Sequence, residues 1–230
     1  MMKLTIFTPT YNRRELLPRV YDSLLKQTCP DFVWLIVDDG SEDDTKSLVE
    51  TWQEQKRLDI RYIRTENGGK MRAHNLGVRL CDTDWFLCLD SDDRLTERAV
   101  EEIYALEEKV ADEKIAGIVA HKGKNEHETL YDTDFPAVET STLYGLYLKG
   151  FRGETTLAFK TEVLRRFPFP EIEGEKYVPE DLIYDRIDKE YVLYVYPKIL
   201  TVCELVNEGY TDSLKKLKEK YKDDKQGYVL

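Results

Sequence analysis

Two hydrophobic patterns alternate along the first 113 residues of the chain. Short runs rich in β-branched and aromatic residues are typical of buried strands, and they lie at 4–8, 32–37, 60–63 and 85–89. Between these runs, apolar residues recur at helical spacing, which predicts helices over 14–26, from 43 onward, over 71–80 and from Thr96 to about Asp112. Repeated units of this kind predict an α/β fold with a mostly parallel central sheet, flanked by helices and joined by right-handed crossovers.

The second half of the chain has a less regular pattern. We expect strands at 115–121, 155–159, 192–196 and 199–205. We expect helices at 141–149, 161–166, 181–189 and 215–222. No internal repeat, low-complexity segment or linker is evident, so a single domain is expected over 1–230. Its parts would be a regular half (1–113), a less regular half (114–212) and a charged C-terminal helix and tail (213–230).

Polar clusters follow three of the expected strands at the point where each strand ends. These clusters are Thr8-Pro9-Thr10-Tyr11-Asn12, Asp38-Asp39-Gly40-Ser41 and Asp90-Ser91-Asp92-Asp93. The carboxyl ends of parallel strands meet at one edge of a sheet, and ligands of such sheets bind at that edge. We therefore expect the three clusters to converge on a binding site.

The acidic cluster that ends at Asp93 is the strongest indication of chemistry. A buried strand would deliver the carboxylates of Asp90, Asp92 and Asp93 into one turn, where they repel each other unless a cation or hydrogen bonds compensate. Hard divalent ions such as Mg²⁺ bind carboxylate oxygens together with substrate phosphates, so we expect a metal at Asp90 and Asp92. The alternative is a helix N-terminus, where Asp side chains satisfy free N–H groups, and Asp93 would serve partly in this way.

Two further motifs in the first half fit either a binding role or an ordinary turn. Asp38-Asp39-Gly40-Ser41 places carboxylates where they could accept hydrogen bonds from a base or ribose, but Asp-Gly is also common in tight turns. Asn67-Gly68-Gly69 precedes a helix, and Lys70 and Arg72 follow it. Backbone amides of such a turn can approach an anion, although a helix C-cap and loop explain the same residues.

Two motifs in the second half are equally ambiguous from the residues alone. Glu180-Asp181 follows Pro179 and precedes an apolar pair, so either carboxylate could be a general base or the two could begin a capped helix. The polar segment 152–156, which contains Glu154, is most simply a turn.

Composition and charge narrow the class of protein. The chain has 230 residues, of which 41% are hydrophobic and 11% aromatic, which argues against disorder, collagen and coiled coil. Its net charge of −11 disfavours nucleic acid as a partner, because phosphate backbones select clustered Lys and Arg. The spacing of the cysteines and histidines fits neither a disulfide framework nor a zinc site. The apolar N-terminal stretch is too short for a signal peptide, and no membrane span is expected, so a cytoplasmic protein is predicted.

Taken together, these motifs resemble those of the GT-A glycosyltransferases, and specifically of family 2. The similarity rests, in order, on Thr8 to Arg13, Val37 to Ser41, Asn67-Gly68-Gly69 with Ala73 and Asn75-Leu76-Gly77, Leu89 to Asp93, and Pro179-Glu180-Asp181. The resemblance is specific through residue 100 and weakens to scattered motifs through about residue 212. It implies a GT-A fold in which 1–113 bind a nucleotide and 114–212 bind an acceptor.

The resemblance also implies a nucleotide-diphosphate sugar as donor, with UDP as the usual nucleotide. Asp39 would hydrogen-bond the base, and Lys70 and Arg72 would contact the diphosphate or ribose. The complete set of residues expected to bind the nucleotide sugar is Pro9, Tyr11, Arg13, Asp39, Lys70, Arg72, Asn75, Asp90, Ser91 and Glu154.

For the reaction itself, the resemblance assigns a metal and a base. Asp92 and Asp90 would hold Mn²⁺ or Mg²⁺ against the diphosphate, and Asp181 would be the catalytic base of an inverting transfer. Glu180 would lie beside Asp181 and shape the acceptor site, and Glu154 would lie where the donor and acceptor loops meet.

The identity of the acceptor stays open at this point. The Gln-x-x-Arg-Trp motif of processive synthases is not evident, which favours transfer of one sugar in cell-surface polysaccharide or glycoconjugate synthesis. A saccharide, a lipid-linked saccharide or a protein could accept the sugar, and a lipid-linked acceptor would allow peripheral contact with the inner membrane face. Two alternatives are a nucleotide-sugar-binding module without turnover and an aspartate-dependent phosphatase. The sequence motif of such phosphatases has Thr or Val at the position where this chain has Arg94.

Overall fold

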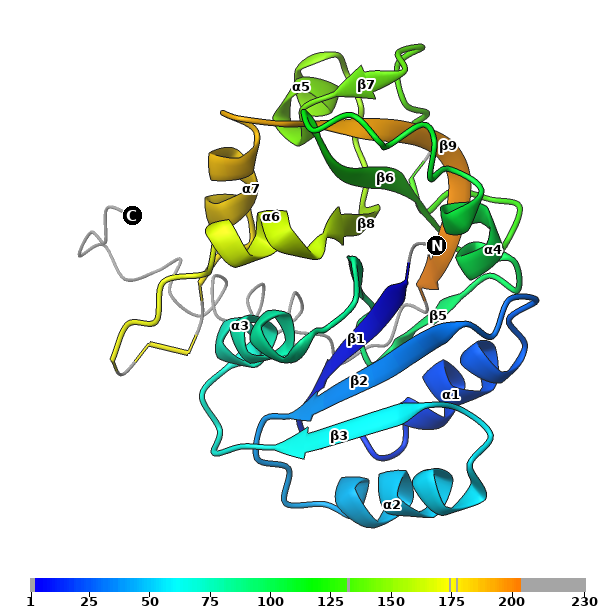
Figure 1. The fold of residues 1–230 in the computed structure, drawn as a ribbon, viewed down its shortest axis with the longest axis vertical. Coiled ribbons are helices and arrows are strands. Elements are labelled where there is room, and N and C mark those ends of the chain that lie inside the picture. The colour runs from blue at the N-terminus through cyan, green and yellow to red at the C-terminus, as the bar shows by residue number, and fades with distance from the viewer. Residues whose placement is uncertain (1–2, 132, 174, 177, 204–230) are drawn as a thin grey trace, which may run out of the picture.

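The computed structural model describes residues 3–203, except 132, 174 and 177. These residues form a nine-stranded sheet in the order β3-β2-β1-β4-β8-β6-β9-β5, with β7 paired to β9 (Figure 1). The expected tail 213–230, its helix at 215–222 and the end of the expected last strand lie outside the described residues.

The first half supplies the parallel part of the sheet. Its four strands are β1 (Leu4–Thr10), β2 (Phe32–Asp38), β3 (Ile60–Arg64) and β4 (Trp85–Cys88). Each pairs in parallel with its neighbour in the order β3-β2-β1-β4. The helices that connect them are α1 (Leu17–Leu25), α2 (Thr45–Gln55) and α3 (Lys70–Leu80).

Both faces of β1, β2 and β4 are buried, which explains their continuous hydrophobic runs. Successive side chains point to opposite faces of a strand, so Ile6 and Phe7 enter different layers of the core. Ile6 packs in the layer that contains residues of α1 and α2, and Phe7 packs in the layer that contains residues of α3. The expected arrangement of a central sheet flanked by helices is confirmed (Figure 1).

The chain after β4 extends the sheet mainly by antiparallel pairing. Its strands are β5 (Asp93–Leu95), β6 (Ile115–Gly123), β7 (Thr140–Ser141), β8 (Thr155–Lys160) and β9 (Val192–Cys203). β8 joins β4 to β6 through two antiparallel pairings, whereas β6 and β9 are parallel. Its helices are α4 (Ala99–Tyr104), α5 (Leu143–Leu148), α6 (Thr161–Arg166) and α7 (Asp181–Ile187). The parallel prediction therefore holds for the first half, and the whole sheet is mixed.

The long helix expected from Thr96 to about Asp112 is wrong. The chain first forms β5, and the backbone N–H of Thr96 donates to the carbonyl of Leu200 at 2.9 Å, so Thr96 belongs to the edge of the sheet and caps no helix. α4 then ends at Tyr104, because the following amides of Leu106 and Glu107 bond three residues back and tighten the chain into turns.

The two expected strands at 192–196 and 199–205 are one strand, β9, as far as Cys203. Pro197 and Lys198 separate the two hydrophobic runs and are exposed. They lie where the register between β6 and β9 shifts, at Ala120 and His121. Because a bulge leaves a residue outside the ladder, it tolerates a proline that has no N–H to donate.

A close approach between α3 and β1 fixes the helix on the sheet. A Cβ added at Gly77 would lie 2.5 Å from Cε2 of Phe7, whose ring is fully buried and stacks on Phe86 at a centroid distance of 5.0 Å. The absence of a side chain at Gly77 thus brings α3, which begins at Lys70, close to the end of β1.

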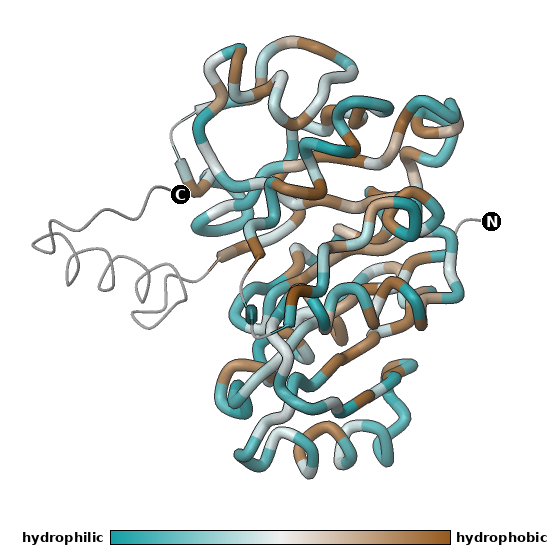
Figure 2. The backbone as a smooth tube through the Cα atoms, turned by 90° about the vertical axis from the view of Figure 1, so that its left-hand side faces the viewer, coloured by the Kyte–Doolittle hydropathy of each residue, from teal (hydrophilic) through white to brown (hydrophobic). Residues whose placement is uncertain are grey.

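Figure 2 shows hydrophobic stretches through the centre of the molecule and hydrophilic stretches along its outer loops.

Replacing Gly77 by alanine is expected to destabilise the fold. Overpacking costs about 1–3 kcal/mol, which exceeds the gain of up to about 1 kcal/mol from removing glycine from a helix. Urea unfolding of Gly77→Ala should therefore give a lower unfolding free energy than wild type, whereas the exposed Leu80→Ala on the same helix should change it by about 0.5 kcal/mol or less. An unchanged or raised stability of Gly77→Ala would contradict this account.

Candidate functional site

The three polar clusters lie at one edge of the sheet, because β2, β1 and β4 are parallel neighbours. The loops after β1 and β2 are also bonded to each other. The Asn12 amide donates to Oγ of Ser41 at 2.8 Å, and the Glu42 amide donates to Oδ1 of Asn12 at 2.8 Å. Asn12 adopts a left-handed φ of 53°, a conformation that asparagine tolerates better than most residues. The expected convergence of these clusters is confirmed.

Asp39 holds the turn that precedes α3. Its side chain accepts hydrogen bonds from the amides of Gly68 at 2.7 Å and Gly69 at 2.8 Å, and Nδ2 of Asn67 lies 3.2 Å from Oδ2. Gly69 has φ +94°, and a Cβ there would lie 2.1 Å from the carbonyl oxygen of Lys176. The amides that could approach an anion therefore bind a carboxylate of this chain, and contact between Asp39 and a base stays a prediction.

Lys70 connects Asp90, in the acidic cluster after β4, with Glu180 in the second half of the chain. Its Nζ lies 2.8 Å from Oδ1 of Asp90 and 2.8 Å from Oε1 of Glu180. Burial alone would raise the pKa of Asp90, but the ammonium groups of Lys70 and Lys122 lower it to about 2. Asp90 is therefore an ionised carboxylate that already has a cationic partner.

Asp93 is also paired, with a lysine that the sequence analysis did not single out. Its Oδ2 accepts from Nζ of Lys122 at 2.8 Å, and the two side chains are only 7% and 15% exposed. Asp93 lies in β5, so its expected role at a helix N-terminus is wrong. Lys122 is the residue before the last in β6, which is otherwise buried, and this single charge in a hydrophobic run was the available indication of a buried pair.

Asp92 differs from its two acidic neighbours. It is half-buried and forms no ion pair or hydrogen bond with another residue in the described part of the chain. Over 3–203, apart from the three gaps, no three His, Cys, Asp or Glu side chains gather in a way that could hold a metal ion. The described structure therefore shows no ready-made ligand cluster, and the metal expected at Asp90 and Asp92 stays a prediction. A Mg²⁺-type site built from one or two carboxylates and substrate phosphates still fits Asp92.

Asp181 is the first residue of α7 and is exposed. Its carboxylate has no bonded partner among the residues that the structure describes. Burial raises the pKa of the Tyr147 phenol, and the negative charges of Asp181 and Glu154 raise it further. Glu154 is exposed, and its Oε2 lies 4.0 Å from Nζ of Lys122, the partner of Asp93.

The other expected donor residues fall into different environments. At the end of β1, Pro9 is buried, whereas Tyr11 is 45% exposed and Arg13 is half-buried. Arg72 donates from Nη2 to the carbonyl of Ile172 at 3.1 Å, and its buried Nε has no partner among the described residues. Ser91 is buried between Asp90 and Asp92. Tyr11 and Arg13 are thus accessible at the predicted nucleotide pocket.

The expected contact between Asn75 and the nucleotide sugar is not supported by the structure. Asn75 is 4% exposed, and its Nδ2 donates to the Phe169 carbonyl and to Oε1 of Glu171, both at 2.9 Å. Its Oδ1 accepts from the Phe169 amide at 2.9 Å. These bonds hold the segment near 170 against α3, and contact between Asn75 and the nucleotide sugar stays a prediction.

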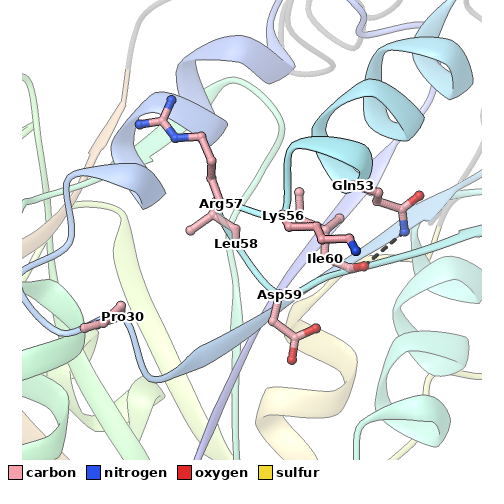
Figure 3. A pocket seen from close by; sticks show the side chains of 7 residues that line it. All are labelled: Pro30, Gln53, Lys56, Arg57, Leu58, Asp59 and Ile60. Carbon is pink, nitrogen blue, oxygen red and sulfur yellow. Dashed lines mark hydrogen bonds between the residues drawn. The ribbon is translucent and has the colours of Figure 1, made fainter.

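A hollow of about 560 Å³ lies at the opposite edge of the sheet, near the beginning of β3. It is lined by Pro30, Gln53, Lys56, Arg57, Leu58, Asp59 and Ile60 (Figure 3). None of the expected site residues lines it. Within the described part of the chain, no helix is long and apolar enough to cross a membrane.

The family of the chain follows from comparison with known proteins. The model of the family described as Glycosyl transferase family 2 matches residues 5–170. The chain therefore belongs to glycosyl transferase family 2, as the motifs predicted. This membership leaves the phosphatase alternative without support.

Curated relatives include cell-wall enzymes. The poly(ribitol-phosphate) β-N-acetylglucosaminyltransferase TarS of Staphylococcus aureus is 23% identical over 213 residues, which cover 91% of this chain and 35% of TarS. A teichoic acid poly(glycerol phosphate) polymerase of Staphylococcus epidermidis is 36% identical over 101 residues, or 44% of this chain and 14% of the polymerase. The chain spans about a third or less of the length of these two relatives.

Solved structures share the fold. S. aureus TarS 1–349 in complex with UDP-GlcNAc superposes with a TM-score of 0.71 at 20% identity, over 99% of this chain and 62% of TarS 1–349. The mannosyltransferase PcManGT of Pyrobaculum calidifontis, in complex with GDP-Man and Mn²⁺, gives 0.65 at 21% identity, over 99% and 65% of the two chains. At this identity the comparison establishes the GT-A fold.

The paired state of Asp90 predicts a pH dependence of stability. A carboxyl whose pKa falls on folding stabilises the protein above its unfolded pKa, and this contribution disappears as the pH falls through the folded value. A shift from 3.8 to about 2 corresponds to at most about 2.5 kcal/mol, and solvent screening of a side chain that is one third exposed reduces this to about 1 kcal/mol. When the pH is lowered from about 6 to about 2.5, the unfolding free energy of both proteins should fall. The fall should be about 1 kcal/mol smaller for Asp90→Asn than for wild type.

Denaturant unfolding at a series of pH values measures this difference. Asp22→Asn, at an exposed position on α1, serves as the control for removing one carboxylate. Equal acid sensitivity of wild type and Asp90→Asn would show that Lys70 contributes nothing to the stability of ionised Asp90.

Proposed function

We propose that the protein transfers a single sugar from a UDP-sugar to a hydroxyl group of a cell-surface, teichoic-acid-like polysaccharide, with inversion at the anomeric carbon. The observation that carries the proposal is the distribution of free carboxylates. In the described structure Asp92 and Asp181 lack partners, whereas Asp39, Asp90 and Asp93 are each bonded. Free carboxylates are available for a ligand and for proton transfer.

In this proposal the donor lies along the carboxyl edge of β2, β1 and β4. Tyr11 and Arg13 line the nucleotide pocket above buried Pro9. Lys70 and Arg72 begin α3 beside that edge and bring positive charge toward the diphosphate. Support for a uridine nucleotide comes from TarS, whose structure contains UDP-GlcNAc. We therefore propose UDP-GlcNAc as the first donor to test.

Asp92 is the residue proposed to hold a divalent metal. When bound, Mn²⁺ or Mg²⁺ would neutralise the negative charge of the leaving nucleoside diphosphate. The free, half-buried carboxylate of Asp92 suits that role, and Mn²⁺ accompanies the nucleotide in PcManGT. Asp90, whose charge Lys70 already balances, is proposed to contact the ribose.

Asp181 is proposed as the base. Its carboxylate would take the proton of the acceptor hydroxyl while that oxygen forms a bond to the anomeric carbon and the sugar–phosphate bond breaks. The electron pair of the broken bond leaves with the nucleoside diphosphate, so one displacement accounts for the products and inverts the configuration. Glu154, near Tyr147, would lie beside the acceptor.

The acceptor and the cellular location remain part of the proposal. TarS is named for poly(ribitol-phosphate) and the S. epidermidis relative for poly(glycerol phosphate), so polymers with free polyol hydroxyls are suitable test acceptors. We propose a cytoplasmic location with peripheral contact at the inner membrane face, where lipid-linked acceptors would be presented.

Replacing the proposed base should remove turnover and preserve donor binding. Asp181→Asn keeps the size of the side chain and removes the proton acceptor, so UDP release from UDP-GlcNAc in the presence of Mn²⁺ and acceptor should fall by about 10²–10⁴-fold. The dissociation constant for UDP, measured by calorimetry, should stay within about twofold, because the base contacts the acceptor. Asp185→Asn, exposed on the same helix, is the control. Retained turnover in Asp181→Asn would refute the assignment.

Replacing Asp92 should abolish the metal-dependent part of donor binding. Calorimetry of UDP with and without Mn²⁺ should show that the ion strengthens binding to wild type and not to Asp92→Ala, because the carboxylate that holds the ion has been removed. Asp22→Ala controls for the loss of one negative charge elsewhere. An equal gain from Mn²⁺ in wild type and Asp92→Ala would exclude Asp92 as a ligand.

A further inference from the structure

One ammonium group bridges two carboxylates from distant parts of the chain. Lys70 is the first residue of α3, Asp90 follows β4, and Glu180 immediately precedes α7. Nζ of Lys70 lies 2.8 Å from a carboxylate oxygen of each. The side chains of Lys70, Asp90 and Glu180 are 38%, 34% and 44% exposed, so each is only partly accessible to solvent. The start of α7 is thereby tied to the donor side of the site.

An apolar contact reinforces this tie. Ile183, one turn into α7, is fully buried and packs in one cluster with Met71, the neighbour of Lys70, and with Phe169 and Val178. The start of α7 is therefore held against the start of α3 by a hydrophobic contact and by the ion pair of Glu180.

Asp90 and Glu180 keep the ammonium group of Lys70 charged. Burial lowers the pKa of Lys70, but Asp90 and Glu180 raise it well above its usual range. Burial lowers the pKa of His74 to about 3 and raises that of Tyr184 well above its usual range, so both neighbours are neutral. Glu180 makes no side-chain hydrogen bond to cap α7, and its carboxylate is directed to Lys70 instead.

We propose that Glu180 is a positioning residue, which sets the place of the adjacent Asp181 through Lys70 and does not itself touch donor or acceptor. The same ammonium that balances Asp90 on the donor side thus orients the base on the acceptor side. This inference rests on the proposed function, because Asp181 is the base of that reaction. It revises the expectation that Glu180 shapes the acceptor site by direct contact.

A double-mutant cycle in turnover tests the dependence on Lys70. UDP release from UDP-GlcNAc with Mn²⁺ is measured for wild type, Glu180→Gln, Lys70→Met and the double variant. Glu180→Gln should lower kcat by about 10-fold and leave the KM for UDP-GlcNAc within about twofold, because Asp90 still holds Lys70 on the donor side while the base loses its support. In the Lys70→Met background the same substitution should lower kcat by about twofold or less, because the partner is already absent.

Amide hydrogen exchange tests the positioning directly, without turnover. The backbone amide of Ile183 bonds to the carbonyl of Glu180 at 3.2 Å, and that of Leu182 bonds to the carbonyl of Pro179 at 3.3 Å. Both amides should exchange at least about threefold faster in Glu180→Gln and in Lys70→Met than in wild type, because the first turn of α7 loses its ionic anchor.

The matched control is Glu190→Gln. Glu190 forms a 2.7 Å ion pair with Arg166, and its side chain is 49% exposed, close to the 44% of Glu180. Removing this pair should change neither kcat nor the exchange of the amides at the start of α7. A change like that of Glu180→Gln would mean that any lost ion pair in this region has the same effect, and the proposal would be wrong.

Two results would overturn the inference. Multiplicative effects of Glu180→Gln and Lys70→Met on kcat would show that Glu180 acts independently of Lys70. Unchanged exchange of the Leu182 and Ile183 amides would show that the ion pair does not hold the helix. If wild type releases no UDP and transfers no sugar, the proposed function fails, and the exchange measurement still decides whether Lys70 and Glu180 fix the start of α7.

Discussion

Carboxylates at the ends of buried strands must be compensated, and this requirement organises the site. Repulsion between clustered acidic groups is reduced here by a separate partner for each of three carboxylates. Asp39 is bonded to two backbone amides of the turn before α3, Asp90 to Lys70, and Asp93 to Lys122. Each of these bonds joins a strand end to another element, so compensating the charge also fixes the loops around the site.

The carboxylates left without a partner in the described structure define what the site can do. Asp92 remains free at the donor edge and Asp181 at the start of α7. The two come from opposite halves of the chain, which are joined by the antiparallel pairing of β4 with β8 and by the bridge through Lys70. A transferase needs one group near the leaving diphosphate and another near the attacking hydroxyl, and the proposal assigns these roles to Asp92 and Asp181.

The sequence predicted the elements that local pattern determines, and it failed where distant residues decide the structure. The strands and helices from β1 to β4 were predicted because their hydrophobic periods are clear. The helix after Thr96 and the division of β9 at Pro197 were wrong, since pairing between β5 and β9 and a bulge against β6 override local preference. At the site, the motifs identified the acidic cluster, but the ion pair of Asp93 with Lys122 and the bonding of Asn75 to the segment near 170 depend on tertiary contacts that no spacing reveals.

The central claim is that the unpaired Asp92 and Asp181 face one donor molecule at the carboxyl edge of the sheet. A crystal structure of the protein with UDP-GlcNAc and Mn²⁺ tests it most directly. We expect the diphosphate and the ion at Asp92, the uracil near Tyr11, and the anomeric carbon within reach of a hydroxyl held by Asp181. A nucleotide bound elsewhere, such as in the hollow beside β3, with Asp92 facing solvent, would contradict the account.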